Sequence, residues 1–251
     1  MTDWTQSYFE RGYAQRWALG APSEETKQDV DALWGLLALS RGSTVLDVGC
    51  GHGRYAIAFG RRAGEVVGVD SSWNLLRRAQ YLAAERGVSV CWVRGDMRQL
   101  PFRSAQFRAG IMLDAFGFFE QEEEHDTSLR ELARVLAPSA RVALKVVNAE
   151  PIVANFRATD VEERDGTIVK ISRALTGHPI RLIEQLSITG PHGSDNYERR
   201  QRLYAESELS AALYRAGLAV SAVFASASGV AFDSASSPTM LIIGERLLHA
   251  A

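Results

Sequence analysis

The chain has 251 residues, of which 46% are hydrophobic and 23% charged, and this composition is typical of a globular protein rather than a disordered or fibrous one. Its formal net charge of -2 gives no general attraction to polyanions, so we expect no nucleic-acid partner. Its two cysteines lack metal-ligand spacing, and no apolar run approaches the roughly 20 residues that span a bilayer, so we expect no metal, no disulfide framework and no membrane partner.

Residues 1–40 are predicted to form an N-terminal helical cap. They begin with MTDWTQSYFERGYAQRW, which is aromatic and of balanced charge instead of basic and then apolar. Such a segment does not resemble a secretory signal, and we expect a cytoplasmic protein. Tyr8, Phe9, Tyr13 and Trp17 recur at helical spacing, which indicates an amphipathic helix.

Residues 41–150 alternate short β-branched runs with helical patterns. Strands separated by helix-length segments indicate βαβ units and a parallel sheet, because parallel neighbours need long crossovers. The predicted strands lie at residues 44–48, 65–70, 88–93, 107–113 and 141–147. The clearest intervening helices are expected at 72–86, which Gly87 ends, and at 127–136, which Pro138 ends.

Residues 151–205 alternate apolar and polar residues, which is typical of antiparallel strands with one buried face. Asp165-Gly166 and Gly177–Pro179 supply turn signals between these strands. We therefore expect an antiparallel insertion that acts as a lid and binds substrate.

Residues 206–251 return to the pattern of the core. A helix is expected at 207–217, with Ser207 as its N-cap and Gly217 at its end. Two closing strands follow at 218–226 and 239–247. The predicted fold is thus α/β, a doubly wound, Rossmann-like and mostly parallel seven-stranded sheet with the antiparallel β insertion.

The strongest functional signal is VLDVGCGHGRYAIAF at 45–59, where a predicted strand runs into three glycines and then a helix. Glycines remove the Cβ atoms that would block a ligand, and the first N–H groups of a helix are free to bind an anionic group. In a doubly wound sheet this first turn is where nucleotide-like ligands bind. We expect Gly49, Gly51 and Gly53 to hold a cofactor, although a tight turn without a ligand would use the same glycines.

Two acids follow the next predicted strands. Asp70 ends the second strand, where a carboxylate can accept hydrogen bonds from both hydroxyls of a ribose, and a helix N-cap is its alternative role. Asp96 follows the third strand, where a carboxylate can accept from an adenine amine while Met97 packs on the ring. A solvated loop is the alternative for Asp96. Together the two positions favour an adenosine ligand.

This combination resembles the class I S-adenosylmethionine (SAM) dependent methyltransferases, whose first motif is D/E-x-G-x-G-x-G. The motif spans Asp47 to Gly53, and the resemblance continues through EVVGVDSS and GDMRQLPF to LRELARVLAPSARVAL, with APSA where the family commonly has KPGG. It implies SAM as cofactor and S-adenosylhomocysteine (SAH) as product. The implied cofactor-binding residues are Asp47, Gly49, Gly51, Gly53, Asp70, Ser71, Asp96, Met97 and Leu113.

Within that family, the aromatic N-terminus, the DAFGFFE block at 114–120 and the insertion are similar to the small-molecule branch that includes amino-sugar N-methyltransferases and glycine N-methyltransferase. In those relatives an N-terminal tyrosine and a nearby basic residue fold over SAM. The resemblance therefore adds Tyr13 and Arg16 to the cofactor-binding residues, although amphipathic packing explains Tyr13 equally well. The implied partner is a small-molecule methyl acceptor, and a monomer or homodimer is expected.

Methyl transfer from a sulfonium is an in-line SN2 displacement, so the protein mainly aligns the reactants and excludes water. A general base is needed only for an acceptor that arrives protonated. Asp114 follows the fourth strand, at the edge where ligands bind, and His178 and His192 lie in the insertion. These three are the candidate catalytic residues, although both histidines also fit turn-exposed surface.

Two other functions stay open. A nicotinamide-dependent reductase shares the fold and the acid after the second strand, but its G-x-G-x-x-G fingerprint places the third glycine one residue later. A non-catalytic SAM- or partner-binding protein would keep the same loop and acids. We favour a methyltransferase that acts on an N, O or C nucleophile.

Overall fold

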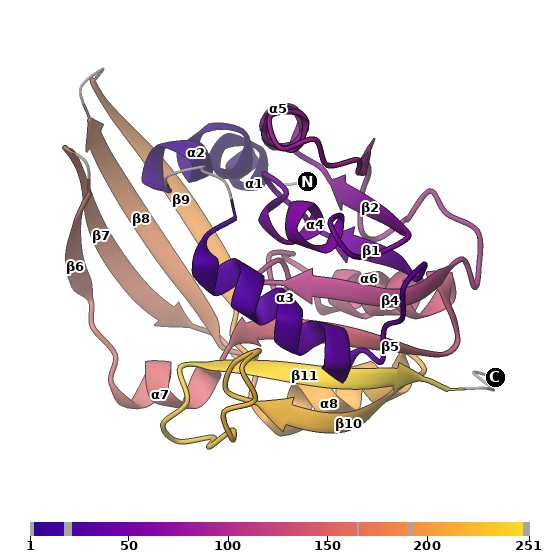
Figure 1. Ribbon diagram of the computed structural model, residues 1–251. Coiled ribbons are helices and arrows are strands. Elements are labelled where there is room, and N and C mark those ends of the chain that lie inside the picture. Colours follow the sequence, from indigo (N-terminus) through magenta and orange to yellow (C-terminus); the bar gives the residue numbers. More distant parts are fainter. Residues whose placement is uncertain (1–2, 18–21, 165, 191–192, 248–251) are drawn as a thin grey trace.

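A seven-stranded sheet lies at the centre of the molecule, with strand order β10-β11-β5-β4-β1-β2-β3 (Figure 1). The computed structural model describes residues 3–17, 22–164, 166–190 and 193–247. The first five strands run parallel to one another, whereas β11 is antiparallel to both β5 and β10. This confirms the predicted Rossmann-like sheet. The strands are β1 (Thr44–Val48), β2 (Glu65–Asp70), β3 (Cys91–Arg94), β4 (Phe107–Leu113), β5 (Leu136–Val147), β10 (Leu218–Phe224) and β11 (Thr239–Arg246).

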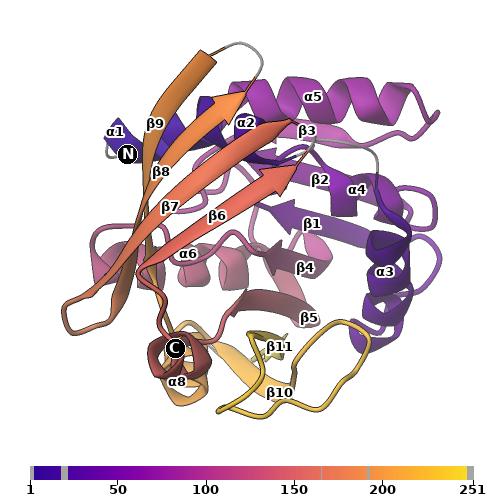
Figure 2. The same ribbon diagram turned by 90° about the vertical axis from the view of Figure 1, so that its left-hand side faces the viewer.

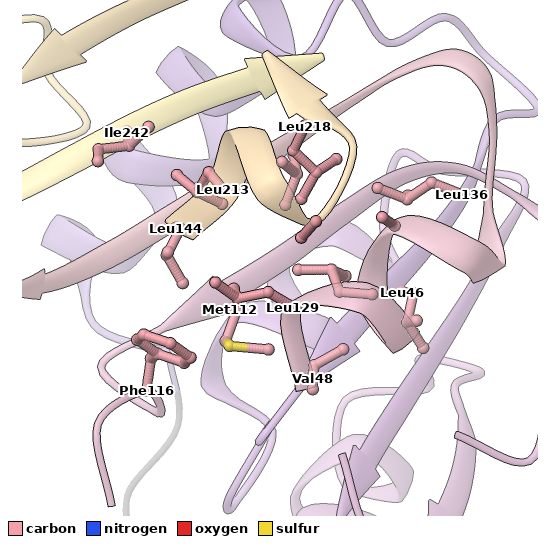
Figure 3. Packing of buried hydrophobic residues seen from close by; sticks show 14 of the residues in the cluster. Leu46, Val48, Met112, Phe116, Leu129, Leu136, Leu144, Leu213, Leu218 and Ile242 are labelled. Carbon is pink, nitrogen blue, oxygen red and sulfur yellow. The ribbon is translucent and has the colours of Figure 1, made fainter. Parts of the chain in front are cut away.

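Helices cover both faces of this sheet, because successive side chains of a strand point to opposite faces. Val45 faces one cluster, with side chains of α3 (Glu24–Leu36) and α4 (Arg54–Phe59). Leu46 faces the other, with α6 (Glu122–Val135) and α8 (Glu206–Arg215) (Figure 3). α5 (Trp73–Ala84) packs near β3 and α4. Within the described residues, no helix is long and apolar enough to cross a membrane.

The predicted core elements correspond closely to the observed ones. β1, β2 and β4 have the predicted bounds, and β3 begins at Cys91, later than expected. α6 begins at Glu122, earlier than predicted, because Gln121 and Glu124 form a capping box at its start. Hydrophobic periodicity alone therefore predicted the start of α6 too late, because it does not take capping hydrogen bonds into account.

The start of α8 corrects one prediction. The helix begins at Glu206, so Ser207 lies in its first turn and is not the N-cap. Glu208 accepts a hydrogen bond from the Ala205 backbone N–H at 3.0 Å and caps the helix from inside. Gly217 follows the helix with φ +85°, as predicted for a residue at its end.

A second sheet of four antiparallel strands stands beside the first (Figures 1 and 2). α7 (Ala149–Ala154) leads into it from β5. This confirms the predicted antiparallel insertion. In the predicted turn Gly166 has φ +74°, and Asp165 lies outside the described residues. The strands, in spatial order, are β6 (Thr159–Arg164), β7 (Thr167–Thr176), β8 (Arg181–Gly190) and β9 (Gly193–Arg202).

Residues 3–17, here called the N-terminal segment, form the successive helical turns α1 (Asp3–Ser7), the π-helical η1 (Tyr8–Gly12) and α2 (Tyr13–Arg16). The segment lies between β9 and α5 (Figure 1). Tyr8 is buried against apolar residues of the four-stranded sheet. Gly12 lies so close to Tyr197 of β9 that a Cβ there would be 2.8 Å from the tyrosine ring. The segment therefore docks tightly on the four-stranded sheet.

Candidate functional site

A cavity of about 450 Å³ opens at the carboxyl ends of β1, β2 and β4, where ligands bind in open α/β sheets. β1 lies between β2 and β4, so the chain reverses the direction of its crossovers at this point. The N-terminal segment supplies Thr5, Phe9 and Tyr13 to the cavity wall. Of the residues that the sequence indicated for the cofactor, those on the wall are Tyr13, Asp47, Gly49, Gly51, Asp70, Ser71, Asp96, Met97 and Leu113.

The three glycines after β1 have different roles. A Cβ at Gly49 would lie 2.4 Å from that of Ala115, so this glycine allows two turns to approach. A Cβ at Gly51 would meet no atom within 4 Å and would stand in open space at the cavity wall. Gly53 is not on that wall, and a Cβ there would lie 2.4 Å from the ring of Trp92. Gly51 therefore leaves room for a ligand, and Gly53 serves packing.

Asp70 is held rigidly at the end of β2. Its two carboxylate oxygens accept hydrogen bonds from the Gly51 and Ser72 backbone N–H groups, each at 2.8 Å. Burial raises the pKa of Asp70, and these N–H groups oppose that rise. Ser72 is the N-cap of α5, with its hydroxyl accepting from the Leu75 N–H, so Asp70 is not the cap. The carboxylate is thereby fixed at the cavity wall, in contact with the glycine turn.

Asp47 is a buried carboxylate, and one of its oxygens lacks a hydrogen-bond partner. It is 3% exposed, and its Oδ2 atom has no hydrogen-bond partner. Burial raises the pKa of Asp47 to about 7, with Arg54 opposing the rise and Asp70 adding to it. A buried polar atom without a partner is rare in folded proteins, and here it belongs to a residue of the cavity wall. A cationic or hydrogen-bond-donating ligand would satisfy it.

Asp96 and Met97 lie on the wall with Arg98, which the sequence did not single out. Asp96 accepts hydrogen bonds from the Arg98 backbone N–H at 2.9 Å and from its Nε at 3.0 Å. Arg98 also pairs with Glu124 of α6 and lies over the ring of Phe119, 4.9 Å from its centroid. This network fixes the Asp96 carboxylate beside the thioether of Met97. Its position in GDMRQLPF, directly after Asp96 and Met97, could have indicated that Arg98 lies at the cavity.

Asp114 lies on the wall between two cations. Arg54 donates to its Oδ2 at 2.8 Å and Lys145 at 3.3 Å. Asp114 has φ +61°, an unusual conformation for a residue with a side chain, and such strain concentrates at functional sites. Arg54 is the first residue of α4, directly after the glycine turn, so the motif itself contained the signal for this missed cation.

Tyr13 and Arg16, which the resemblance paired, have different surroundings. Tyr13 lies on the cavity wall, and burial raises the pKa of its hydroxyl. Arg16 is not on the wall. Its side chain is 5% exposed and pairs with Glu162 at 2.6 Å and with Glu184 at 3.7 Å. These ion pairs tie the end of the N-terminal segment to the four-stranded sheet.

Of the two candidate histidines of the insertion, His178 is not brought to the cavity. His178 is exposed in the turn between β7 and β8, beside a separate surface hollow. His192 lies outside the described residues. His52 of the glycine turn does line the cavity, and burial lowers its pKa to about 4, aided by Arg54 and Arg78. The described residues include no group of three or more histidine, cysteine or acidic side chains arranged to hold a metal ion.

An aromatic wall from the DAFGFFE block completes the cavity. Phe118 and Phe119 line it, whereas Phe116 is buried in the core. The Phe119 backbone N–H donates to Nε2 of His125 at 3.1 Å, and His125 is 2% exposed. Burial lowers the pKa of His125 to about 4, with Arg181 and Arg202 adding to the effect. A neutral imidazole therefore anchors the aromatic wall.

Known proteins resemble this chain at two levels, the first being sequence. Residues 45–139 match the family model described as a methyltransferase domain. A relative is the 2-phytyl-1,4-naphtoquinone methyltransferase of Nostoc punctiforme, 38% identical over 112 residues, which are 43% of this chain and 47% of that protein. The match to this curated relative thus spans about half of its length. The family-model match includes the glycine turn.

The second level is the fold. The structure of the CcbJ methyltransferase from Streptomyces caelestis superposes with a TM-score of 0.78 at 18% identity and covers 98% of this chain and 97% of that one. SAM-bound CalS10, an amino pentose methyltransferase from Micromonospora echinaspora, superposes with a TM-score of 0.62 at 20% identity over 95% of this chain and 96% of its own. The match to the domain family, the motif order and the shared fold confirm the resemblance to the class I SAM-dependent methyltransferases seen in the sequence, and residues 45–139 belong to the methyltransferase domain family.

Proposed function

We propose that this protein transfers a methyl group from SAM to a small-molecule acceptor. The observation that carries the proposal is the cavity at the carboxyl ends of β1, β2 and β4, where open space beside Gly51 meets the fixed carboxylate of Asp70. A nucleotide-like ligand needs close backbone approach and an acceptor for its ribose hydroxyls, and this wall offers both.

The residues present fit SAM along its whole length. Asp70 would accept hydrogen bonds from the ribose hydroxyls, and Asp96 with Met97 would hold the adenine. The unpartnered Oδ2 of Asp47 would accept from the ammonium group of the methionine part. Arg54, on the same wall, would hold the carboxylate of that part.

The chain's own contribution to the reaction is alignment. Bound SAM supplies a methyl group already activated on a sulfonium, so transfer needs an in-line approach of the acceptor and exclusion of water. Phe9, Tyr13 and Phe118 give the cavity wall an aromatic part. These rings would pack against the acceptor and keep water away from the methyl group.

Asp114 is a candidate base on the cavity wall, but it is engaged by Arg54 and Lys145. Both cations donate to the same Oδ2 atom, so that oxygen already has protein partners. We therefore assign Asp114 the role of orienting Arg54, and an acceptor that arrives as a neutral nucleophile needs no base. His178, exposed and away from the cavity, takes no part in this proposal, and neither does His192.

The N-terminal segment and the four-stranded sheet together would form a cover over the cavity. The segment lines the cavity with Thr5, Phe9 and Tyr13 and docks on the sheet through Tyr8 and Gly12. In open α/β folds such additions carry acceptor specificity, while the core carries the cofactor. The amino pentose methyltransferase named above, which shares the fold, supports a small acceptor.

Incubation with methyl-labelled SAM and fractionated small-molecule extract tests the proposal. We expect label to appear in a small molecule, identified by mass, together with SAH. The matched control is Gly51→Val, which should fold and transfer no label. If the wild-type protein binds SAH tightly in calorimetry and labels nothing, it is a binding protein; if it binds NADH and not SAH, the cofactor assignment is wrong.

A further inference from the structure

Glu10, on η1 of the N-terminal segment, places its carboxylate at the start of α5. It accepts hydrogen bonds from the Trp73 backbone N–H at 3.0 Å and from the Asn74 N–H at 3.2 Å. The hydroxyl of Ser72 donates to it at 3.0 Å, and the Asn74 side-chain amide donates to the Glu10 backbone carbonyl at 3.1 Å. The first N–H groups of a helix lack partners within the helix and attract negative charge. Glu10 satisfies this end of α5 from a distant part of the chain.

The residues that Glu10 contacts also hold the acid expected at the ribose. The hydroxyl of Ser72 donates a hydrogen bond to Glu10, and the backbone N–H of Ser72 donates one to Asp70 at 2.8 Å. Asp70 in turn accepts from the Gly51 N–H at 2.8 Å. A continuous chain of hydrogen bonds thus runs from the N-terminal segment, through the start of α5, to the glycine turn.

Other side chains of the N-terminal segment contact the cavity and the four-stranded sheet. Phe9 and Tyr13 line the cavity, and Tyr8 packs on the four-stranded sheet. The Trp4 indole N–H donates to Glu120 at 3.0 Å, which closes the segment onto the aromatic wall. The segment thus forms one side of the cavity wall, and opening this side requires the segment to move away from α5. That movement would break the contacts of Glu10 with Ser72, Trp73 and Asn74.

We propose that Glu10 is a positioning residue, which latches the N-terminal segment to α5 over the cofactor cavity and so slows release of SAM and SAH. The inference rests on the proposed function, because it takes the cavity to hold the cofactor. Opening costs charge-assisted hydrogen bonds, and losing them should speed release by roughly tenfold or more. Because the same contacts order Ser72 beside Asp70, closure and the ribose-binding acid are stabilised together.

The test compares Glu10→Ala and Glu10→Gln with the wild-type protein and with Glu25→Ala, which removes an exposed acid from the first turn of α3. Stopped-flow measurement of SAH release should give a dissociation rate constant about tenfold higher in Glu10→Ala, with a small change in the association rate constant. Glu10→Gln keeps one acceptor oxygen and should be intermediate. Asn74→Ala removes one contact from the opposite side and should shift release in the same direction.

Limited trypsin digestion supplies a readout that needs no ligand. Cleavage after Arg11 and Arg16 should be faster in Glu10→Ala than in Glu25→Ala, and SAH should protect the wild-type protein more. A general loss of stability would lower the melting temperature without raising the release rate of the folded fraction. Equal release rates and equal cleavage in all variants would overturn the latch. A wild-type protein that binds no SAH would overturn both the proposed function and the cofactor role of Glu10, whatever the digestion shows.

Discussion

At the scale of single residues, Asp70 holds the site together, because it joins the end of β2 to the glycine turn and faces the cavity. Two charge-assisted hydrogen bonds to a ribose should each contribute about 1.5–3 kcal/mol. Asp70→Asn should therefore weaken SAH binding by tens-fold or more in calorimetry. Glu65→Gln, at the exposed opposite end of the same strand, is the control and should bind as the wild-type protein does.

Gly51 and Gly53 offer a matched pair. Both have positive φ, +56° and +81°, so alanine strains the backbone at both positions by about 1 kcal/mol. At Gly51 the new methyl enters open space where the cofactor is expected, whereas at Gly53 it meets the ring of Trp92. Gly51→Ala should mainly weaken SAH binding, and Gly53→Ala should mainly lower the melting temperature. The reverse pattern would place the ligand elsewhere.

The buried His125 makes stability depend on pH. Its pKa is lowered to about 4 in the folded protein, against about 6.5 in the unfolded chain. Between pH 6.5 and pH 4 the unfolded state binds a proton that the folded state does not bind. The contribution of the neutral His125 to the free energy of unfolding is therefore fully present above pH 6.5 and is lost as the pH falls toward 4. The loss amounts to about 3 kcal/mol.

Comparison with His125→Gln isolates this effect from those of His52 and Asp47, which stay in both proteins. The wild-type protein should exceed the variant in free energy of unfolding most strongly at pH 7.5. Denaturant titrations at successive pH values should show the difference shrinking between pH 6.5 and 4. A difference that stays constant with pH would mean that His125 is not held neutral.

At the scale of elements, the N-terminal segment and the four-stranded sheet meet through Gly12 and Tyr197. Alanine normally stabilises a helix over glycine by about 1 kcal/mol, but here its methyl would lie 2.8 Å from the tyrosine ring. Gly12→Ala should therefore undock the segment, and trypsin should cleave after Arg11 and Arg16 sooner. Gly35→Ala in α3 is the control, because a methyl there meets nothing within 4 Å and should add stability.

The elements also show what the sequence could predict. β1 and β2 matched their predicted bounds because each is rich in β-branched residues, and β4 matched because it is a short, mostly apolar run. The π-helical turn at Tyr8–Gly12 had no such signal, since it depends on packing against β9. Arg16 was expected at the cofactor from the family resemblance, and its ion pairs with Glu162 and Glu184 of the four-stranded sheet had no sequence signal, because these partners lie far along the chain. Spacing locates residues that share a turn, but not those that meet from distant parts of the chain.

At the scale of the whole molecule, ligand binding should appear as stability. A ligand that binds only the folded state adds about 2.7 kcal/mol at a concentration of 100 times its Kd. Saturating SAH should raise the melting temperature of the wild-type protein, and NADH should not. A melting temperature that rises with NADH and not with SAH would contradict the cofactor assignment.

The docking of Tyr8 on Tyr197 has a consequence for biosynthesis. The aromatic N-terminal segment is synthesised long before the β9 strand that buries it. At about 5–20 residues per second, the segment waits roughly ten to forty seconds without its partner. Tyr8, Phe9 and Tyr13 are then open to nascent-chain chaperones, and the segment is expected to dock only after β9 has been synthesised. Pulse-labelled chains arrested before β9 should bind such chaperones more strongly than chains arrested after it.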